Sequence, residues 1–376
     1  MEKKIIILNH GLHISGVSRA LVNMANGLVE KGHDVTIKLE INNFTLASEL
    51  DARVKVQLFL KDWRILGMRI PGFLRFYYWV LKHQNKIPSS LLHRLIVGNG
   101  YDVEIAFNRG AAARIISASA NPNSKKIVWV HNDYMRCSNP LAGFDSLQDA
   151  QNAYARFDSI VCVSNQSKQA FYEKFGNYSS IICCNNVLDF NRIYSLKKFI
   201  VPETSGRVLC AVGRVSKQKN YPMLLEAVRI LNMRGVQFTL WIVGDGEDMA
   251  EIAAIKEQLG LNNVVLWGAK ENPYPYLAAA DAYICSSIYE GLSTTTIEAL
   301  VLGKACVVTD CTGMRDILGD SEYGLVVPIS AEALADGMEK ILTDDALRTH
   351  YEAKAIERSG RYEPDRCISE IEELFE

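Results

Sequence analysis

The sequence predicts an α/β protein with two parallel-sheet domains in tandem. Short continuous apolar runs, typical of strands buried on both faces of a parallel sheet, alternate along the chain with segments of helical periodicity. A polar stretch at 195–206, "SLKKFIVPETSG", interrupts this alternation, which then starts again. Because alternating strands and helices form βαβ units, each half of the chain is expected to build its own parallel sheet.

The first half begins with a predicted strand at 4–8, "KIIIL", followed by the loop "NHGLHISG". The next segment carries apolar residues at helical spacing from Val17 onward and ends near Gly32, since glycine is common at helix C-termini. A strand returns at 34–40. Further buried strands are expected at 102–107, 126–131, 159–164 and 180–185.

In the second half, strands are expected at 207–213, 238–244, 264–268, 282–287, 305–309 and 324–328. Helices are expected at 221–235, 247–260, 273–281, within 289–300 and at 331–344, with a turn at 310–314. These patterns predict an N-terminal domain over 1–195, a linker over about 195–206 and a C-terminal domain over 206–361. In such sheets, ligands bind at the carboxyl ends of the strands and often between domains.

Composition narrows the class of protein. The 376 residues are 48% hydrophobic and 22% charged, which is ordinary for a soluble globular protein. The net charge of −2 gives no argument for nucleic-acid binding. The nine cysteines include no C-x-x-C pair, which fits reduced thiols in a cytoplasmic protein better than disulfides or a zinc site. The first apolar run, Ile5–Leu8, is too short for a signal peptide, and no run of about 18 apolar residues predicts a membrane span.

One segment, 61–94, differs from the rest. Seven lysines and arginines stand there against one acid, Asp62, with six aromatic residues between them. Such a segment could lie on an anionic membrane surface. It could equally be a solvated basic face whose aromatic residues belong to the core. Both interpretations stay open.

Two cations follow the first strand of the second half. In "VGRVSKQKN", Arg214 stands at the strand end and Lys219 just before the next helix. An arginine fork and a lysine point charge could neutralise a diphosphate, although both could also be solvated surface residues. The next strand ends in "GDGEDM", where Gly244 and Gly246 lack the third glycine of a dinucleotide fingerprint.

The stretch "YEGLSTTTIEAL", at 289–300, places Glu290 and Glu298 around three threonines. Thr295 and Glu298 have the spacing of a capping box, which would make Glu298 part of an ordinary helix start. The alternative is that this helix start holds a ligand. Glu298 would then accept hydrogen bonds from ribose hydroxyls, and Glu290 would face the group beyond the phosphates.

A helix start offers backbone N–H groups and a favourable dipole to an anion. Leu292, Ser293 and Thr294 would present such groups here. In the first half, Gly16 leads into a helix and could let backbone N–H groups approach a phosphate, although a plain turn is the simpler explanation. His131 ends a strand in "WVHNDY"; such a histidine is usually structural, but this one would also face the interdomain cleft.

Together, the order and spacing of these residues resemble the retaining family 4 glycosyltransferases of the GT-B fold, over nearly the whole chain. The E-x(7)-E motif of the family fits Glu290 and Glu298, and its Arg…Lys pair fits Arg214 and Lys219. Its strand-end histidine and its N-terminal glycine loop fit His131 and Gly16. The segments 264–300 and "CNNVLDF" look like the subgroup that builds bacterial capsule, exopolysaccharide and related surface glycans.

The resemblance implies roles for these residues. Arg214 and Lys219 would hold the donor diphosphate, Glu298 the ribose and Glu290 the sugar, with His131 on the other side of that sugar. The remaining donor contacts would come from Gly16, Gly213, Gly244, Gly268, Lys270, Leu292, Ser293, Thr294 and Thr295. Two positions depart from the family pattern, which often has glycine where this chain has Ser15 and Asn220.

The expected reaction is transfer of a hexose from a nucleotide sugar, with a UDP-sugar as the expected donor, to a glycan acceptor with retention of configuration. A lipid-linked acceptor, surface polysaccharide biosynthesis and attachment to the cytoplasmic membrane face are inferred from the subgroup and from 61–94. No acidic cage is evident, so neither a cofactor nor a metal is expected. The C-terminal segment 362–376 is expected to pack back on the first domain, as in the family.

Two other functions remain possible at this point. A sugar-nucleotide epimerase on the same fold would convert the donor without an acceptor. A non-catalytic partner subunit would keep the fold and lack the chemistry.

Overall fold

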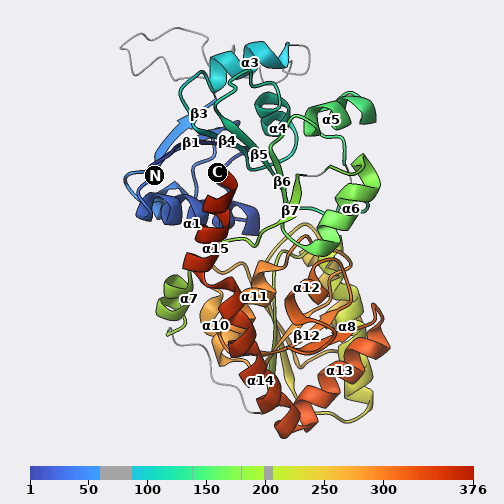
Figure 1. Cartoon of the computed structure of the whole chain (residues 1–376). Coiled ribbons are helices and arrows are strands. Elements are labelled where there is room, and N and C mark those ends of the chain that lie inside the picture. Colours follow the sequence, from blue (N-terminus) through green and yellow to red (C-terminus); the bar gives the residue numbers. More distant parts are fainter. Residues whose placement is uncertain (60–86, 138, 179, 199–205) are drawn as a thin grey trace, which may run out of the picture. The chain divides into compact units, whose positions relative to one another are not determined.

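The computed structural model describes residues 1–59, 87–137, 139–178, 180–198 and 206–376. They form two compact units, coloured along the chain in Figure 1. Unit 1 comprises Met1–Val187 and Pro364–Glu376, and unit 2 comprises Leu188–Glu363. Most of the basic and aromatic segment predicted at 61–94 lies outside the described residues.

Unit 1 is built on a seven-stranded parallel sheet in the order β3-β2-β1-β4-β5-β6-β7. Its strands are β1 (Lys4–Asn9), β2 (Asp34–Leu39), β3 (Lys55–Leu58), β4 (Val103–Ala106), β5 (Lys125–Val130), β6 (Ser159–Cys162) and β7 (Ile181–Cys183). β1 lies between β2 and β4, with Ile7 in register with both Ile37 and Ile105, and Ile7 is fully buried. β3 is not predicted from the sequence, because its alternating "KVQL" lacks the continuous apolar run of a central strand.

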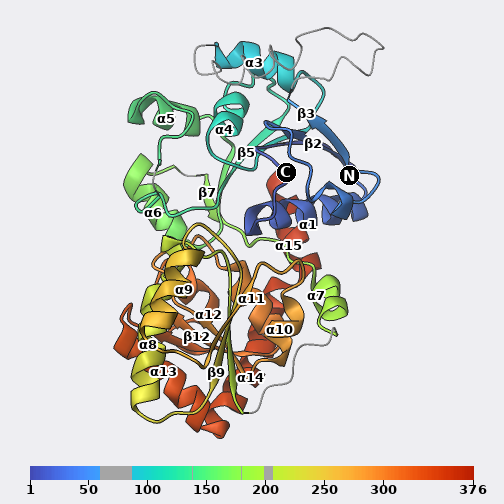
Figure 2. The ribbon, with the colours of Figure 1, turned by 180° about the vertical axis from the view of Figure 1, so that it is seen from behind.

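Helices cover both faces of this sheet, as the two views in Figures 1 and 2 show. The described helices of unit 1 are α1 (Gly16–Glu30), α3 (Ser89–Ile96), α4 (Ala111–Ile116), α5 (Leu147–Tyr154), α6 (Asn165–Phe175) and α15 (Pro364–Glu372). Residues of α3 to α6 share one core with inward side chains of β1, β4, β5 and β6. α1 packs against α15.

The family resemblance assigns the C-terminal segment 362–376 to the first domain. Of this segment, Pro364–Glu376 lie in unit 1, where they form α15 and a short 3₁₀ turn. His33, just after α1, lies 2.8 Å from Glu372 through Nε2 and Oε1. Gly27 brings α1 close to α15, because a Cβ at this position would lie 2.6 Å from side-chain atoms of Ile368.

Unit 2 is built on a six-stranded parallel sheet in the order β10-β9-β8-β11-β12-β13. Its strands are β8 (Val208–Val212), β9 (Thr239–Val243), β10 (Val264–Gly268), β11 (Ala282–Cys285), β12 (Ala305–Thr309) and β13 (Leu325–Val327). The prediction of two parallel-sheet α/β domains is therefore confirmed. The strand order reverses direction between β8 and β11, and a switch point of this kind is where parallel sheets bind ligands.

The helices of unit 2 are α7 (Phe190–Leu196), α8 (Tyr221–Met233), α9 (Met249–Gln258), α10 (Tyr274–Ala279), α11 (Thr294–Val301), α12 (Met314–Leu318), α13 (Ala331–Thr343) and α14 (Asp345–Ser359). Residues of α8, α9 and α13 share the main core with the sheet, and α10, α11 and α14 lie on the opposite face (Figure 2). α14 is not among the helices predicted from the sequence, and the turn expected at 310–314 ends where α12 begins.

The boundary between the units falls after Val187, before the linker predicted at 195–206. The reason is α7, which packs on α10 and α11 of unit 2. Tyr194 donates a hydrogen bond from its hydroxyl to the Val301 carbonyl at 3.2 Å, and Asn272 Nδ2 donates to the Leu196 carbonyl at 2.9 Å. Within the described ranges, no helix has both the length and the hydropathy to cross a membrane.

Candidate functional site

The switch point of unit 2 brings two strand ends together. β8 is followed by Gly213 and a short 3₁₀ helix, η4 (Lys217–Lys219), and β11 is followed by a loop that leads into α11. The two loops are tied together, since the Ile288 N–H donates to the Gln218 carbonyl at 2.9 Å and the Ser286 hydroxyl to the Lys219 carbonyl at 2.7 Å. Residues about 70 positions apart in the chain therefore share one small site.

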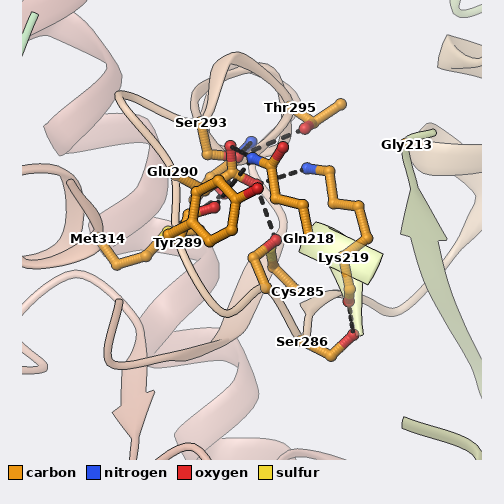
Figure 3. Close-up of polar contacts among 12 residues, drawn as sticks. Gly213, Gln218, Lys219, Cys285, Ser286, Tyr289, Glu290, Ser293, Thr295 and Met314 are labelled. Atoms are coloured by element: carbon orange, nitrogen blue, oxygen red, sulfur yellow. Dashed lines mark hydrogen bonds and ion pairs between the residues drawn. The ribbon is translucent and has the colours of Figure 1, made fainter. Parts of the chain in front are cut away.

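Lys219 and Glu290 form an ion pair at this site (Figure 3). Lys219 Nζ lies 2.7 Å from Glu290 Oε1, and the side chains are only 15% and 10% exposed. Burial alone would lower the pKa of Lys219, but Glu290, together with smaller contributions from Cys285, Tyr283 and Tyr221, outweighs that effect and raises the pKa well above its ordinary value. Lys219 is therefore charged at neutral pH.

Two further side chains hold the Glu290 carboxylate. The Ser287 hydroxyl donates to Oε1 at 2.7 Å, and Gln218 Nε2 donates to Oε2 at 3.2 Å. The sequence analysis named neither residue. Their positions in the sequence could have suggested both residues, because Gln218 directly precedes Lys219 and Ser287 lies three residues before Glu290 at the same strand end.

Two predicted site glycines shape the backbone around Lys219. A Cβ at Gly213 would lie 2.9 Å from Lys219 Cε, and a Cβ at Gly244 would lie 1.8 Å from the Gly213 carbonyl oxygen. Gly244 thus needs to be glycine for the close approach of the β8 and β9 ends, whereas the neighbour of Gly213 is the flexible end of the Lys219 side chain. Asn220, where the family often has glycine, adopts the left-handed conformation with φ 51° and ψ 45°, which asparagine tolerates better than most residues.

The start of α11 differs from the predicted capping box. Ser293 is the N-cap, accepting from the Thr296 N–H at 3.4 Å, and Thr294 is the first helical residue. Thr295 already lies inside the helix, so Glu298 is too far along to bond back to the N-cap. The capping-box interpretation is therefore wrong, because Ser293 has the extended backbone that a cap requires.

Glu298 instead meets a neighbouring helix. Its Oε1 accepts a hydrogen bond from the hydroxyl of Tyr274, a buried residue of α10, at 3.2 Å. At the end of β10, Lys270 Nζ lies over the rings of Trp267 and Tyr276, at 5.6 and 5.9 Å from their centroids. Gly268 accepts from the Gly244 N–H at 2.9 Å, which joins the ends of β9 and β10.

Arg214 does not share the burial of Lys219. Its Nε lies 3.2 Å from Glu247 Oε2 at the surface, where the two side chains are 75% and 57% exposed. Of the two cations predicted to bind a diphosphate, Lys219 belongs to a buried network and Arg214 to an ion pair at the surface.

The two predicted site residues of the first domain lie in unit 1. Gly16 is the first residue of α1, and the preceding Ser15 caps the helix by accepting from the Ser18 N–H at 3.2 Å. His131 directly follows β5 and is buried, with its ring 4.7 Å from that of Phe107. Among the described residues, neither ring nitrogen of His131 makes a hydrogen bond of ordinary geometry, although the Phe107 backbone lies near enough to oppose part of the effect of burial on the pKa. Burial lowers the pKa of His131 to about 4, so the ring is neutral at neutral pH.

Two family models match consecutive parts of the chain. The model described as "Glycosyltransferase Family 4" matches residues 14–189, and the model described as "Glycosyl transferases group 1" matches residues 195–358. Together they account for most of both units.

Curated relatives carry names of the same class. One, from Campylobacter jejuni, is named N-acetylgalactosamine-N,N'-diacetylbacillosaminyl-diphospho-undecaprenol 4-alpha-N-acetylgalactosaminyltransferase. It is 34% identical to this chain over 160 residues. The match spans 42% of this chain and 43% of that protein. Another, an uncharacterized glycosyltransferase from Haemophilus influenzae, is 25% identical over 373 residues, or 97% of each chain.

Solved structures show the same fold. The crystal structure of Anabaena Alr3699/HepE in complex with UDP matches with a TM-score of 0.76 and 18% identity over 98% of both chains. The sheet orders, the two family models and these relatives agree with one another. The chain therefore belongs to the glycosyltransferases of the GT-B fold.

Proposed function

We propose that the protein transfers a hexose from a UDP-sugar to a glycan acceptor, with retention of the anomeric configuration. The observation that carries this proposal is the buried Lys219–Glu290 pair at the switch point of the unit 2 sheet. An ammonium group that stays charged although buried suits a diphosphate, and an adjacent carboxylate suits sugar hydroxyls. The UDP bound in the Anabaena relative is the reason for choosing a uridine nucleotide.

In this proposal, the cations act on the leaving group. Lys219, Arg214 and the N-terminus of α11 would stabilise the negative charge that develops on the departing diphosphate. Gly213, Gly244 and the segment Leu292–Thr295 would let backbone and hydroxyl groups approach it. Glu290 would bind the sugar and orient its anomeric carbon.

The rest of the donor would lie along the same sheet edge. Glu298, held by Tyr274, would accept hydrogen bonds from the ribose hydroxyls. Backbone groups near Gly268 and Lys270 would meet the base. The neighbouring order of β10, β9 and β8 supports one continuous donor site, because the carboxyl ends of these strands share an edge of the sheet.

For the acceptor, we propose a lipid-linked glycan and a role in surface polysaccharide biosynthesis at the cytoplasmic membrane face. The support is the name of the Campylobacter relative, which specifies a diphospho-undecaprenol acceptor, and the basic, aromatic composition of 61–94. Gly16 and His131 of unit 1 would contribute to the sugar and phosphate contacts. A neutral His131 would serve as a hydrogen-bonding partner and not as a cation.

The proton of the acceptor hydroxyl needs a destination. We propose that the leaving diphosphate oxygen takes it, which requires no dedicated protein base. We further propose that the two cations replace a metal ion at the diphosphate. Loss of turnover in the presence of a chelator, restored by manganese, would overturn this part.

The first test is thermal unfolding of the purified protein, without metal, against UDP, GDP, ADP and their common hexose conjugates. Ligand at 100 times its dissociation constant adds roughly 2.7 kcal/mol, or a few degrees for domains of this size. Stabilisation by uridine nucleotides that is lost in Lys219→Met supports the donor site. Glu226→Gln, which removes a charge from a surface ion pair on α8, is the control and should leave the shift unchanged.

The second test identifies the reaction. Incubation of the stabilising UDP-hexose with lipid-linked acceptors, followed by NMR of the anomeric proton, should show a new linkage with retained configuration. Conversion of the donor sugar without an acceptor would indicate an epimerase instead. Absence of binding by every nucleotide, together with an unchanged cellular glycan in Glu290→Ala, would indicate a non-catalytic partner subunit.

A further inference from the structure

The two buried groups of the donor site contact each other directly. The proposed function gives Lys219 to the diphosphate and Glu290 to the sugar, yet Nζ and Oε1 lie 2.7 Å apart. Figure 3 shows the lysine side chain extended along the loop toward the glutamate. In this structure, the ammonium group already has an anionic partner.

The position of that anion is fixed by its surroundings. Besides its hydrogen bond to Glu290, Gln218 Nε2 donates to the Tyr289 carbonyl at 2.9 Å. Ser287 is fully buried, and its carbonyl accepts from the Thr309 hydroxyl of β12 at 2.6 Å. The residues that hold the carboxylate are thus themselves anchored to the backbone and to the sheet.

This arrangement has a consequence for an incoming diphosphate. A diphosphate at Lys219 would place a second anion beside the same ammonium group, within a few ångströms of the Glu290 carboxylate. Repulsion between two anions is strong where water is largely excluded. The carboxylate therefore opposes the binding that the ammonium group favours.

We propose that Glu290 is the internal counter-ion of Lys219, held in place by Ser287 and Gln218, and that it weakens the binding of nucleoside diphosphates. This inference rests on the proposed donor site and adds a second task to Glu290. After transfer, UDP carries the full charge of the leaving group, and the carboxylate competes with it for Lys219. Glu290 thereby promotes release of the product.

The test is the affinity for UDP, measured by isothermal titration calorimetry near neutral pH. Glu290→Gln keeps the size of the side chain and removes its charge, so UDP should bind about tenfold or more tightly, in the range for interactions with charged groups. UMP, which lacks the second phosphate, should gain less. Turnover of the UDP-hexose should fall in the same variant, because the sugar contact is lost.

The positioning residues give a second, independent measurement. Gln218→Met keeps both charges but releases one carboxylate oxygen, so UDP affinity should rise by less than in Glu290→Gln. Damage to the fold would weaken UDP binding, whereas the inference requires stronger binding. Glu226→Gln serves as the control for net charge, and its UDP affinity should equal that of the wild type.

Two results would overturn the inference. One is a wild-type protein that binds UDP while Glu290→Gln binds it equally or less tightly. The other, decisive if Glu290→Gln does not fold, is an unchanged or lower affinity in Gln218→Met. A wild-type protein that binds no nucleoside diphosphate would refute the proposed function itself, so the two failures are distinguishable.

Discussion

Lys219 in unit 2 and His131 in unit 1 are both buried bases near the carboxyl edge of a parallel sheet, but at neutral pH the first is positively charged and the second is neutral. Each follows a buried strand at the carboxyl edge of a parallel sheet, and burial lowers the pKa of both. Lys219 has Glu290 at 2.7 Å, and its net pKa is raised. At His131 only the Phe107 backbone opposes the effect of burial, and the pKa falls to about 4. Neighbouring Glu290 therefore offsets the effect of burial at Lys219, whereas at His131 burial prevails.

Arg214 and Glu247 supply a third case on the same sheet edge as Lys219. Their separation, 3.2 Å, is similar to that of the buried pair, but both side chains are more than half exposed. Water and salt screen such a pair, which makes it weak and easily exchanged for another partner. A surface cation of this kind can turn to a ligand at little cost in free energy.

The largest expected effect comes from breaking the buried pair on one side. Lys219→Met leaves the Glu290 carboxylate buried without its cation, so the free energy of unfolding of unit 2 should fall by about 3–5 kcal/mol. Chemical denaturation followed by tryptophan fluorescence measures this change. The double variant Lys219→Met/Glu290→Gln should recover much of the loss, and an equally unstable double variant would show that the charge is not the cause.

The buried His131 should make the free energy of unfolding depend on pH. Because the pKa of folded His131, about 4, lies below the ordinary value of 6.5, the unfolded chain binds more protons between these values. This contribution to stability is complete above about pH 6.5 and is lost as the pH falls toward 4, by about 3 kcal/mol in total. His131→Phe should flatten the pH dependence of the free energy of unfolding in this interval, as measured by chemical denaturation at a series of pH values.

The third effect concerns binding. Arg214→Ala should weaken UDP binding by about 1.5–3 kcal/mol, the range for charged hydrogen bonds, with little change in stability. Calorimetric titration with UDP checks the first part and thermal unfolding the second. An unchanged affinity would mean that Arg214 is only a surface cation.

The smallest effect is expected at the surface pair. Glu247→Gln should change the free energy of unfolding by about 0.2–1 kcal/mol, and the change should shrink in high salt. Denaturation at two salt concentrations measures it. A loss as large as that of Lys219→Met would contradict the distinction between buried and exposed pairs.

Much of the fold could be predicted because central strands have a strong local signal. "IIIL" and "VLCAV" are continuous apolar runs, and both form buried parts of inner strands. The apolar pattern is weaker in strands at the edge of a sheet, because these strands are partly exposed to water. The edge strand β3 is not predicted from the sequence for this reason. Residues 199–205 of the linker predicted at 195–206 lie outside the described residues, and its first two residues belong to α7, which packs on α10 and α11.

The candidate site was only partly predictable. Lys219 and Glu290 stand out as charges at strand ends, but Ser287 and Gln218 are common polar residues whose importance depends on what they touch. The capping-box error had a similar origin. Thr295–Glu298 and Ser293–Thr296 are both acceptable cap spacings in the sequence, and the backbone conformation selects the second.

The sequence by itself determined the two parallel sheets and the residue types at their carboxyl edges, because apolar periodicity and strand-end positions are local properties. Tertiary structure alone decided which of these residues meet. Lys219 and Glu290 are 71 residues apart and come together only because β8 and β11 are neighbours in the sheet. Charge state followed from that contact, since the free energy of a buried charge depends on the distance to its partner and on the exclusion of water.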